Sequence, residues 1–64
     1  MRYVIAAPVG RMILYLKRAP NDRVPDRLNW VVDKLTATAL DNAADAVALA
    51  FACGDDTWVE ECLW

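Results

Sequence analysis

The stretch TATALDNAADAVALAFACGDD, residues 36–56, predicts one helix together with its start and stop signals. Asp41 is expected at the N-cap, because its carboxylate can accept hydrogen bonds from free backbone N–H groups of the first turn. Gly54 is expected to end the helix in the left-handed conformation. Between these signals only Asp45 is charged, and it lies near the helix N-terminus, where the helix dipole favours an acid.

The spacing of apolar residues predicts which side of this helix packs on a sheet. Residues three and four positions apart form one stripe, with Val47 and Phe51 as its largest members. The predicted core stripe comprises Ala43, Ala46, Val47, Ala50 and Phe51. The predicted outer side comprises Asn42, Asp45, Ala48, Leu49 and Ala52. Two explanations of this alanine-rich outer side stay open: alanine stabilises a short helix, or the side contacts a second copy or a target.

The flanking segments predict the strands of that sheet. RYVIAAP and RMILYLKR are expected to form a hairpin joined by a tight Pro-Val-Gly turn. APNDRVPDR, rich in proline, asparagine and aspartate, predicts a loop. TWVEECLW predicts a closing strand.

The segment LNWVVDKLTATAL fits two structures. Leu28, Val31 and Leu35 have helical spacing, and Pro25 could open such a helix at its first turn. The strand propensity of NWVV favours a short third strand around Trp30, with a bend at KLTAT. With that strand, residues 1–64 are expected to form a single α+β domain, a small antiparallel sheet of three to four strands packed on one α-helix in the order β-β-β-α-β.

Length and composition restrict the class of protein. The chain has 64 residues, 58% of them hydrophobic, which suits one small soluble domain. It has no run long enough for a membrane span and no segment resembling a signal peptide, so we expect no membrane association and an intracellular location. Two cysteines, Cys53 and Cys62, are too few for a disulfide framework and are expected to be buried thiols, although a pair stays open.

Charge is unevenly divided along the chain. Residues 1–32 carry six basic and two acidic side chains, a balance of +4, whereas residues 33–64 carry one basic and seven acidic side chains, a balance of −6. Such a division predicts a bipolar molecule, or faces that pair with one another on folding.

The residues that most enzymes need are missing. The chain has no histidine, serine or glutamine and only two glycines, which excludes Ser-His-Asp and Cys-His nucleophiles and a glycine-rich phosphate loop. We therefore expect a protein that is not an enzyme, with no metal and no cofactor. Partner binding is the remaining class of function, and the acids and the helix outer side are its candidates: Asp45, Leu49, Ala52, Asp55, Asp56, Glu60, Glu61 and Trp64.

Three tryptophans are a large number for so short a chain. Trp30, Trp58 and Trp64 most simply supply core area, because each aromatic buries about 150–250 Å². Trp64 is the last residue of the sequence, so it either packs and holds the fourth strand in place or is an anchor for a partner.

The order YVI, YLKR, Trp30, DKLTATALDNAADAVALA and WVEE resembles that of small phage-encoded strand-strand-strand-helix-strand proteins, which include anti-CRISPR inhibitors. The matching positions are Trp30, Leu35, Thr38, Leu40, Asp41 and Ala46. The helix departs from the pattern, since such proteins usually carry several glutamates and lysines there. The resemblance implies the β-β-β-α-β fold and a stoichiometric inhibitor of bacterial immune complexes, and it transfers no binding residue.

Three functions follow as hypotheses. The first is a phage protein in the cytoplasm of the bacterial host that inhibits a host complex, most concretely an anti-CRISPR whose acidic surface competes with DNA for a Cas surveillance complex. The second is a nucleic-acid-binding accessory or repressor that uses the basic N-terminal half, namely Arg11, Lys17, Arg18, Arg23 and Arg27; a pI near 4.7 makes direct nucleic-acid binding a weak expectation. The third is a structural module that forms a homodimer through the alanine-rich helix.

Overall fold

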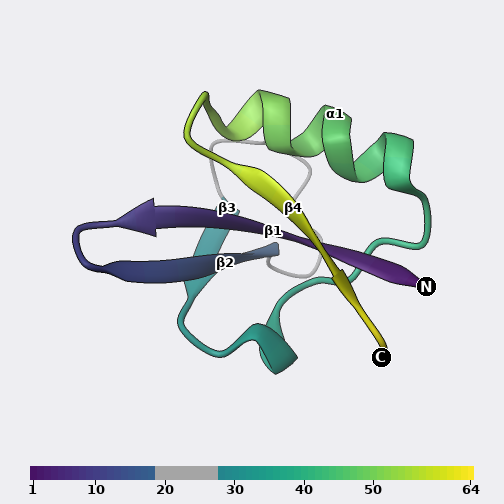
Figure 1. Cartoon of the computed structure of the whole chain (residues 1–64), viewed down its shortest axis with the longest axis horizontal. Coiled ribbons are helices and arrows are strands. Elements are labelled where there is room, and N and C mark those ends of the chain that lie inside the picture. Colours follow the sequence, from purple (N-terminus) through teal and green to yellow (C-terminus); the bar gives the residue numbers. More distant parts are fainter. Residues whose placement is uncertain (19–27) are drawn as a thin grey trace.

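A computed structural model describes residues 1–18 and 28–64 and confirms the predicted α+β fold. The elements are β1 (Arg2–Val9), β2 (Met12–Arg18), β3 (Leu28–Val31), the one-turn 3-10 helix η2 (Lys34–Thr36), α1 (Ala43–Cys53) and β4 (Trp58–Cys62). The strands form one antiparallel sheet in the order β3-β2-β1-β4, with α1 across one face (Figure 1). The predicted loop at residues 19–27, which includes Pro25, lies outside the described residues.

The hairpin is confirmed, with a tighter turn than the sequence predicted. Val9 pairs with Met12, so only Gly10 and Arg11 connect the strands. Gly10 has a φ of 62°, which a two-residue hairpin turn requires at its first position and glycine adopts without strain. Pro8 therefore belongs to β1 rather than to the turn.

The third strand is confirmed at Leu28–Val31, where it pairs with β2. The helical alternative is wrong for these residues, because the segment that follows forms only the single turn of η2. Asp33 caps that turn by accepting a hydrogen bond from the backbone N–H of Leu35 at 3.0 Å. The chain bends there, as predicted for KLTAT, and turns back toward β1.

The segment after η2 fills the gap between β1 and β2, which pair only over the part of β1 that begins at Ala6. The backbone of Leu40 exchanges two hydrogen bonds with Tyr3, at 2.7 and 2.8 Å. The backbone N–H of Thr38 donates to the carbonyl of Leu16 at 3.1 Å. This segment leads directly into α1 and fixes where the helix begins.

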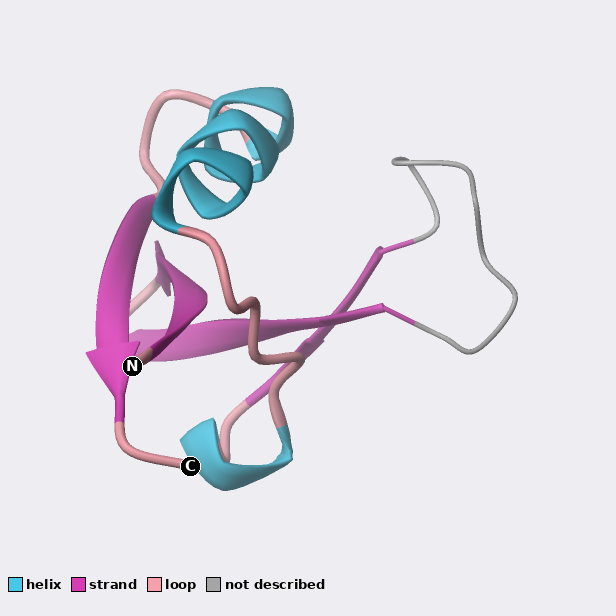
Figure 2. Cartoon of the chain, turned by 90° about the vertical axis from the view of Figure 1, so that its right-hand side faces the viewer, coloured by secondary structure: helices cyan, strands magenta, loops and turns pink. Residues whose placement is uncertain are grey.

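Apolar side chains pack on both faces of the sheet. Ile5, Leu16 and Ala50 form the buried group under α1, and Trp30 packs against it. Val4, Ala37 and Cys62 form the buried group on the other face. Figure 2 shows α1 and η2 at opposite ends of the molecule in that view.

The predicted core stripe of the helix is confirmed at Ala46 and Ala50 and is wrong at its other three residues. The side that packs on the sheet is buried at Ala46 and Ala50 and half-buried at Leu49 and Cys53. The prediction that Val47 and Phe51 face the core is wrong, because Val47 is 56% and Phe51 85% exposed. Ala43 is exposed as well. At 3.6 residues per turn, the buried stripe is rotated by roughly 80° from the predicted one.

The position of α1 on the sheet explains this rotation. The helix packs over β1 and β4, and β4 is the last strand of the sheet. The small side chains of Ala46 and Ala50 let the helix backbone approach the sheet closely. Val47 and Phe51 then lie on the side of the helix that borders the open groove beside β4, where both stay exposed. Leu49, predicted on the outer side, packs against the core instead.

The ends of α1 differ from the predictions in detail. Asn42, not Asp41, is the N-cap, and its side chain accepts hydrogen bonds from the backbone N–H groups of Ala44 and Asp45. Asp41 lies one residue too early to cap and pairs with Arg2 at 3.0 Å. Gly54 ends the helix as predicted, but with φ 133° and ψ 174° rather than in the left-handed helical region.

No disulfide joins Cys53 and Cys62, whose side chains pack on opposite faces of the sheet. Within residues 1–18 and 28–64, no helix is long and apolar enough to span a membrane.

Candidate functional site

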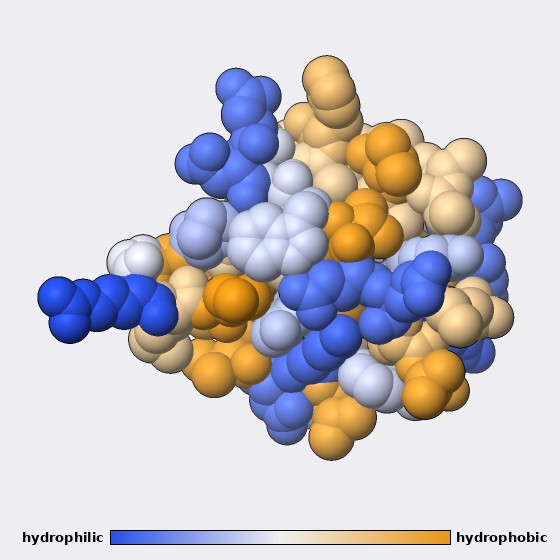
Figure 3. Space-filling model, in the orientation of Figure 1, coloured by the Kyte–Doolittle hydropathy of each residue, from blue (hydrophilic) through white to orange (hydrophobic). Residues whose placement is uncertain are grey.

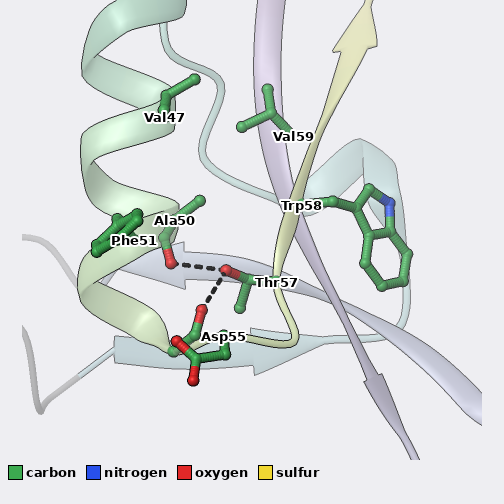
Figure 4. Close-up of a pocket in the computed structure, with 8 residues that line it drawn as sticks. Val47, Ala50, Phe51, Asp55, Thr57, Trp58 and Val59 are labelled. Carbon is green, nitrogen blue, oxygen red and sulfur yellow. Dashed lines mark hydrogen bonds between the residues drawn. The ribbon is translucent and has the colours of Figure 1, made fainter.

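A groove lies between the C-terminal half of α1 and the start of β4 (Figure 4). Its volume is about 370 Å³, and it is open to solvent. The residues that line it are Val47, Ala50, Phe51, Gly54, Asp55, Thr57, Trp58 and Val59. Most of these side chains are apolar, and Asp55 contributes a carboxylate at one end.

The turn between helix and strand sets the shape of this groove. Gly54 adopts a positive φ, which lets the chain leave the helix abruptly and turn through Asp55 and Asp56. The hydroxyl of Thr57 then reaches back to the helix, 2.6 Å from the carbonyl oxygen of Ala50 and 3.0 Å from that of Gly54. These contacts tie the start of β4 to the last turn of the helix.

The helix wall of the groove is apolar and exposed. Phe51 is 85% exposed and Val47, one turn earlier, is 56% exposed. Val59 belongs to the α1 side of β4, whereas Trp58 points to the other face of the sheet (Figure 4). Figure 3 shows apolar surface over α1 beside hydrophilic surface at the turn into β4. An exposed apolar patch next to polar residues is typical of a contact surface.

Three acidic residues border the groove or follow its strand wall. Asp55 lines it, Asp56 is the next residue in the turn, and Glu61 is exposed further along β4. Within the described part of the chain, no salt bridge involves any of the three. The border is therefore negatively charged and suits a positively charged partner.

The other acid of β4, Glu60, is already paired. Its carboxylate accepts from the Nζ of Lys34 at 2.9 Å and from the indole Nε1 of Trp58 at 2.7 Å. The hydrogen bond from Trp58, together with that from Lys34, lowers the pKa of Glu60. The hydrogen bond with Glu60 likewise raises the pKa of Lys34.

Lys34 also makes cation–π contacts with two aromatic rings on the face of the sheet opposite α1. Its Nζ lies 6.0 Å from the ring centre of Tyr15 and 5.8 Å from that of Trp64. Cation–π contacts at such distances contribute about 0.5–1 kcal/mol at exposed sites. This cluster fastens η2 and the last residues to the sheet, and Trp64 remains 40% exposed.

The structure separates the residues predicted to bind a partner. Asp45 and Ala52 are exposed on α1, roughly 100–120° around the helix axis from Phe51, and Leu49 is half-buried. Asp55, Asp56 and Glu61 are exposed at the groove or along its strand. Glu60 and Trp64 belong to the Lys34 cluster. Of the basic residues, Arg11 and Lys17 are exposed, and Arg23 and Arg27 lie outside the described residues.

Sequence reasoning missed Val47 and Phe51 as surface residues. One signal could have found them: Ala46 and Ala50 lie one turn apart, which is the spacing that permits close packing of a helix on a sheet. Comparisons with protein-family models, curated proteins and solved structures give no match for the chain. Function is therefore inferred from the geometry and charge of the described residues.

Proposed function

We propose that this chain is a phage or prophage protein without enzymatic activity that binds and inhibits a host macromolecular complex, most concretely an anti-CRISPR that blocks a Cas surveillance complex. The observation that carries the proposal is the 85% exposure of Phe51 beside an apolar groove with an acidic border. The resemblance of the sequence to small phage-encoded proteins supports the class of inhibitor, and the groove beside Phe51 supports the binding surface.

The exposure of Phe51 is costly for so small a protein. Full burial of a phenylalanine side chain would contribute about 1.5–3 kcal/mol. A domain of 64 residues has a total stability of roughly 3–10 kcal/mol. Leaving the only phenylalanine of the chain in water therefore needs a reason. Contact with a partner is such a reason, because aromatic residues are enriched at the energetic centres of protein interfaces.

The acidic border indicates which part of a partner the surface would meet. Complexes that hold DNA present lysine and arginine to its phosphates. Asp55, Asp56 and Glu61 can compete for the same cations, and contact at Phe51 would supply affinity that charge alone does not. Binding to such a site would exclude DNA from it.

Inhibition of DNA binding by purified Cas surveillance complexes tests the proposal. The protein is added to each complex, and DNA binding is followed by gel shift, with the parent chain compared with Phe51→Ala. Leu63→Ala is the matched control, because Leu63 is an apolar residue of 90% exposure away from the groove. We expect Phe51→Ala to weaken inhibition by about thirtyfold, the effect of a 2 kcal/mol hot spot, and Leu63→Ala to inhibit like the parent.

Charge gives a second readout of the same assay. Asp55→Asn with Asp56→Asn should weaken inhibition at low salt, and the parent should lose affinity as salt rises, because exposed charges are screened over about 8 Å at physiological ionic strength. Equal inhibition by the parent and Phe51→Ala would contradict the proposed surface. A parent protein that itself shifts DNA and inhibits no complex would favour the nucleic-acid-binding alternative.

A further inference from the structure

The strand wall of the groove is the edge of the sheet. β4 pairs with β1 on one side, and no described strand pairs with its other side. An unpaired edge presents backbone N–H and C=O groups to which another chain can add a strand. Which groups of β4 point outward follows from the register of the sheet.

Tyr3 is opposite Glu61 in that register. The backbone N–H and C=O of Tyr3 are both used by Leu40, on the side away from β4. Tyr3 and Glu61 therefore form a pair without mutual hydrogen bonds, and in an antiparallel ladder the backbone groups of Glu61 point outward, as do those of Val59 two residues earlier. In agreement, the Nζ of Lys34 reaches the carbonyl oxygen of Glu61 at 3.3 Å.

Lys34 thus occupies one end of the edge and leaves the other open. The outward groups without a described partner are the N–H and C=O of Val59 and the N–H of Glu61. The side chains of Val59 and Glu61 lie on the face of the sheet that carries α1, and Val59 lines the groove together with Val47 and Phe51. Free backbone groups and an apolar wall therefore line the same groove.

We propose that this groove binds an extended segment of the partner protein, which adds to β4 as a fifth, antiparallel strand. Alternate apolar side chains of the segment enter the groove against Val47 and Phe51, and a lysine or arginine at its C-terminal end meets Asp55. The antiparallel direction follows the rest of the sheet and is the commoner pairing. This inference rests on the proposed function in that the partner is a protein.

Charge complementarity selects this occupant over a second copy of the chain. The border of the groove and the exposed edge are acidic at Asp55, Asp56 and Glu61. A two-fold pair of β4 strands would bring the same three acids from both copies into one interface, and like charges close together in a sheet are destabilising. A basic segment would instead place opposite charges close together, which stabilises its pairing with β4.

A synthetic peptide that alternates valine with lysine and arginine, acetyl-Lys-Val-Arg-Val-Lys-Val-Arg-amide, is the probe. In antiparallel addition, the residues whose side chains face the groove also direct their N–H groups at β4. N-methylation of the three valines should therefore abolish binding to the full chain, measured by fluorescence anisotropy. N-methylation of the lysines and arginines, which alters only the outer edge, should leave it within about twofold. Equal effects of the two patterns, or no binding of the parent peptide, would overturn strand addition.

A pair of protein variants tests the same edge from the other side. Glu61→Pro removes the outward N–H and places a ring on the edge, where proline is tolerated. Glu61→Gln removes the charge and keeps the N–H. We expect Glu61→Pro to bind the peptide at least roughly tenfold more weakly than Glu61→Gln. Circular dichroism checks that both variants fold, and the methylated peptides keep the test decisive if Glu61→Pro does not.

The outcomes separate this inference from the proposed function. Inhibition of a Cas complex that depends on Phe51 without peptide binding would overturn strand addition and leave the proposed function standing. Peptide binding by the expected pattern without inhibition of any complex would support strand addition and contradict the proposed function. A dimer in sedimentation that Glu61→Pro dissociates would overturn the inference and assign the edge to a second copy.

Discussion

The two flanks of α1, one with Ala46 and Ala50 and the other with Val47 and Phe51, have opposite environments. The side that contains Ala46 and Ala50 packs on the sheet with Leu49 half-buried beside them, whereas the side that contains Val47 and Phe51 is exposed. Size therefore does not decide burial in this helix. What decides it is where the sheet ends, since the flank beyond β4 has no described strand to cover it.

This difference favours an interaction surface built into the limits of a small fold. A four-stranded sheet with one helix cannot cover both flanks of that helix. Val47 and Phe51 stay on the uncovered flank of the helix. The Lys34–Glu60 pair and the neighbouring rings cover part of the opposite face of the sheet. One region is thus adapted to packing within the domain, and the other is available for contact.

The largest expected effect comes from a charge placed on the buried flank. Ala46 is 0% exposed, so Ala46→Asp would bury a carboxylate without a partner and cost about 3–5 kcal/mol. With a total stability of roughly 3–10 kcal/mol for this length, the variant should be largely unfolded by circular dichroism. Ala48→Asp, at an exposed position of the same helix, should change the free energy of unfolding by less than about 0.5 kcal/mol. Similar melting of the two variants would mean that Ala46 does not face the sheet.

A smaller effect is expected at the junction between the two flanks. Thr57→Val keeps the shape of the side chain and removes the hydroxyl that contacts the carbonyls of Ala50 and Gly54. It should lower the free energy of unfolding by about 0.5–1.5 kcal/mol in urea. Thr36→Val removes a similar but exposed hydrogen bond to the carbonyl of Asp33 and should cost less. A larger loss for Thr36→Val would contradict the role given to Thr57.

The face opposite α1 should respond to pH. The pKa of Glu60 is lowered from its ordinary value of 4.5, so its pairing stabilises the fold above that value, and this contribution is lost as pH falls through the lowered pKa. Because both partners are partly exposed, the contribution should stay below about 1 kcal/mol. Urea unfolding from about pH 7 down to pH 3 should show the parent losing its advantage over Glu60→Gln. A constant difference across that range would contradict the assignment.

The basic partner of this pair gives the matching test at high pH. The pKa of Lys34 is raised above its ordinary 10.5. Its contribution is therefore complete below 10.5 and is lost as pH rises through the raised value. Lys34→Met should remove the dependence at high pH and only weaken the one at low pH, because the hydrogen bond from Trp58 to Glu60 remains.

Much of the fold follows from local signals, and the exceptions have physical causes. The hairpin and the end of α1 were predictable because Gly10 and Gly54 mark positions that need a positive φ. The short strand around Trp30 followed from β propensity. The buried side of α1 did not, because a helix made mostly of alanine has little contrast between its faces, and the choice depends on which strand lies at the sheet edge.

The candidate site was predicted only in part for the same reason. The acids of the last ten residues are evident in the sequence, and Asp55 does line the groove. The pairing of Glu60 with Lys34 joins residues far apart in the chain, so local patterns could not separate it from the exposed Glu61. Phe51 was assigned to the core because bulk usually indicates burial.

The smallest expected change in stability is at Phe51, where the two flanks differ most. At 85% exposure, Phe51→Ala removes little buried area, and alanine is the better helix former by a few tenths of a kcal/mol. The variant should therefore unfold within about 0.5 kcal/mol of the parent, or be slightly more stable, whereas a core phenylalanine would cost about 3–5 kcal/mol. The same variant should be the one that loses inhibition and peptide binding. A loss of more than about 2 kcal/mol in urea would place Phe51 in the core. Unchanged inhibition and unchanged peptide affinity would contradict the proposal that the exposed flank binds a partner.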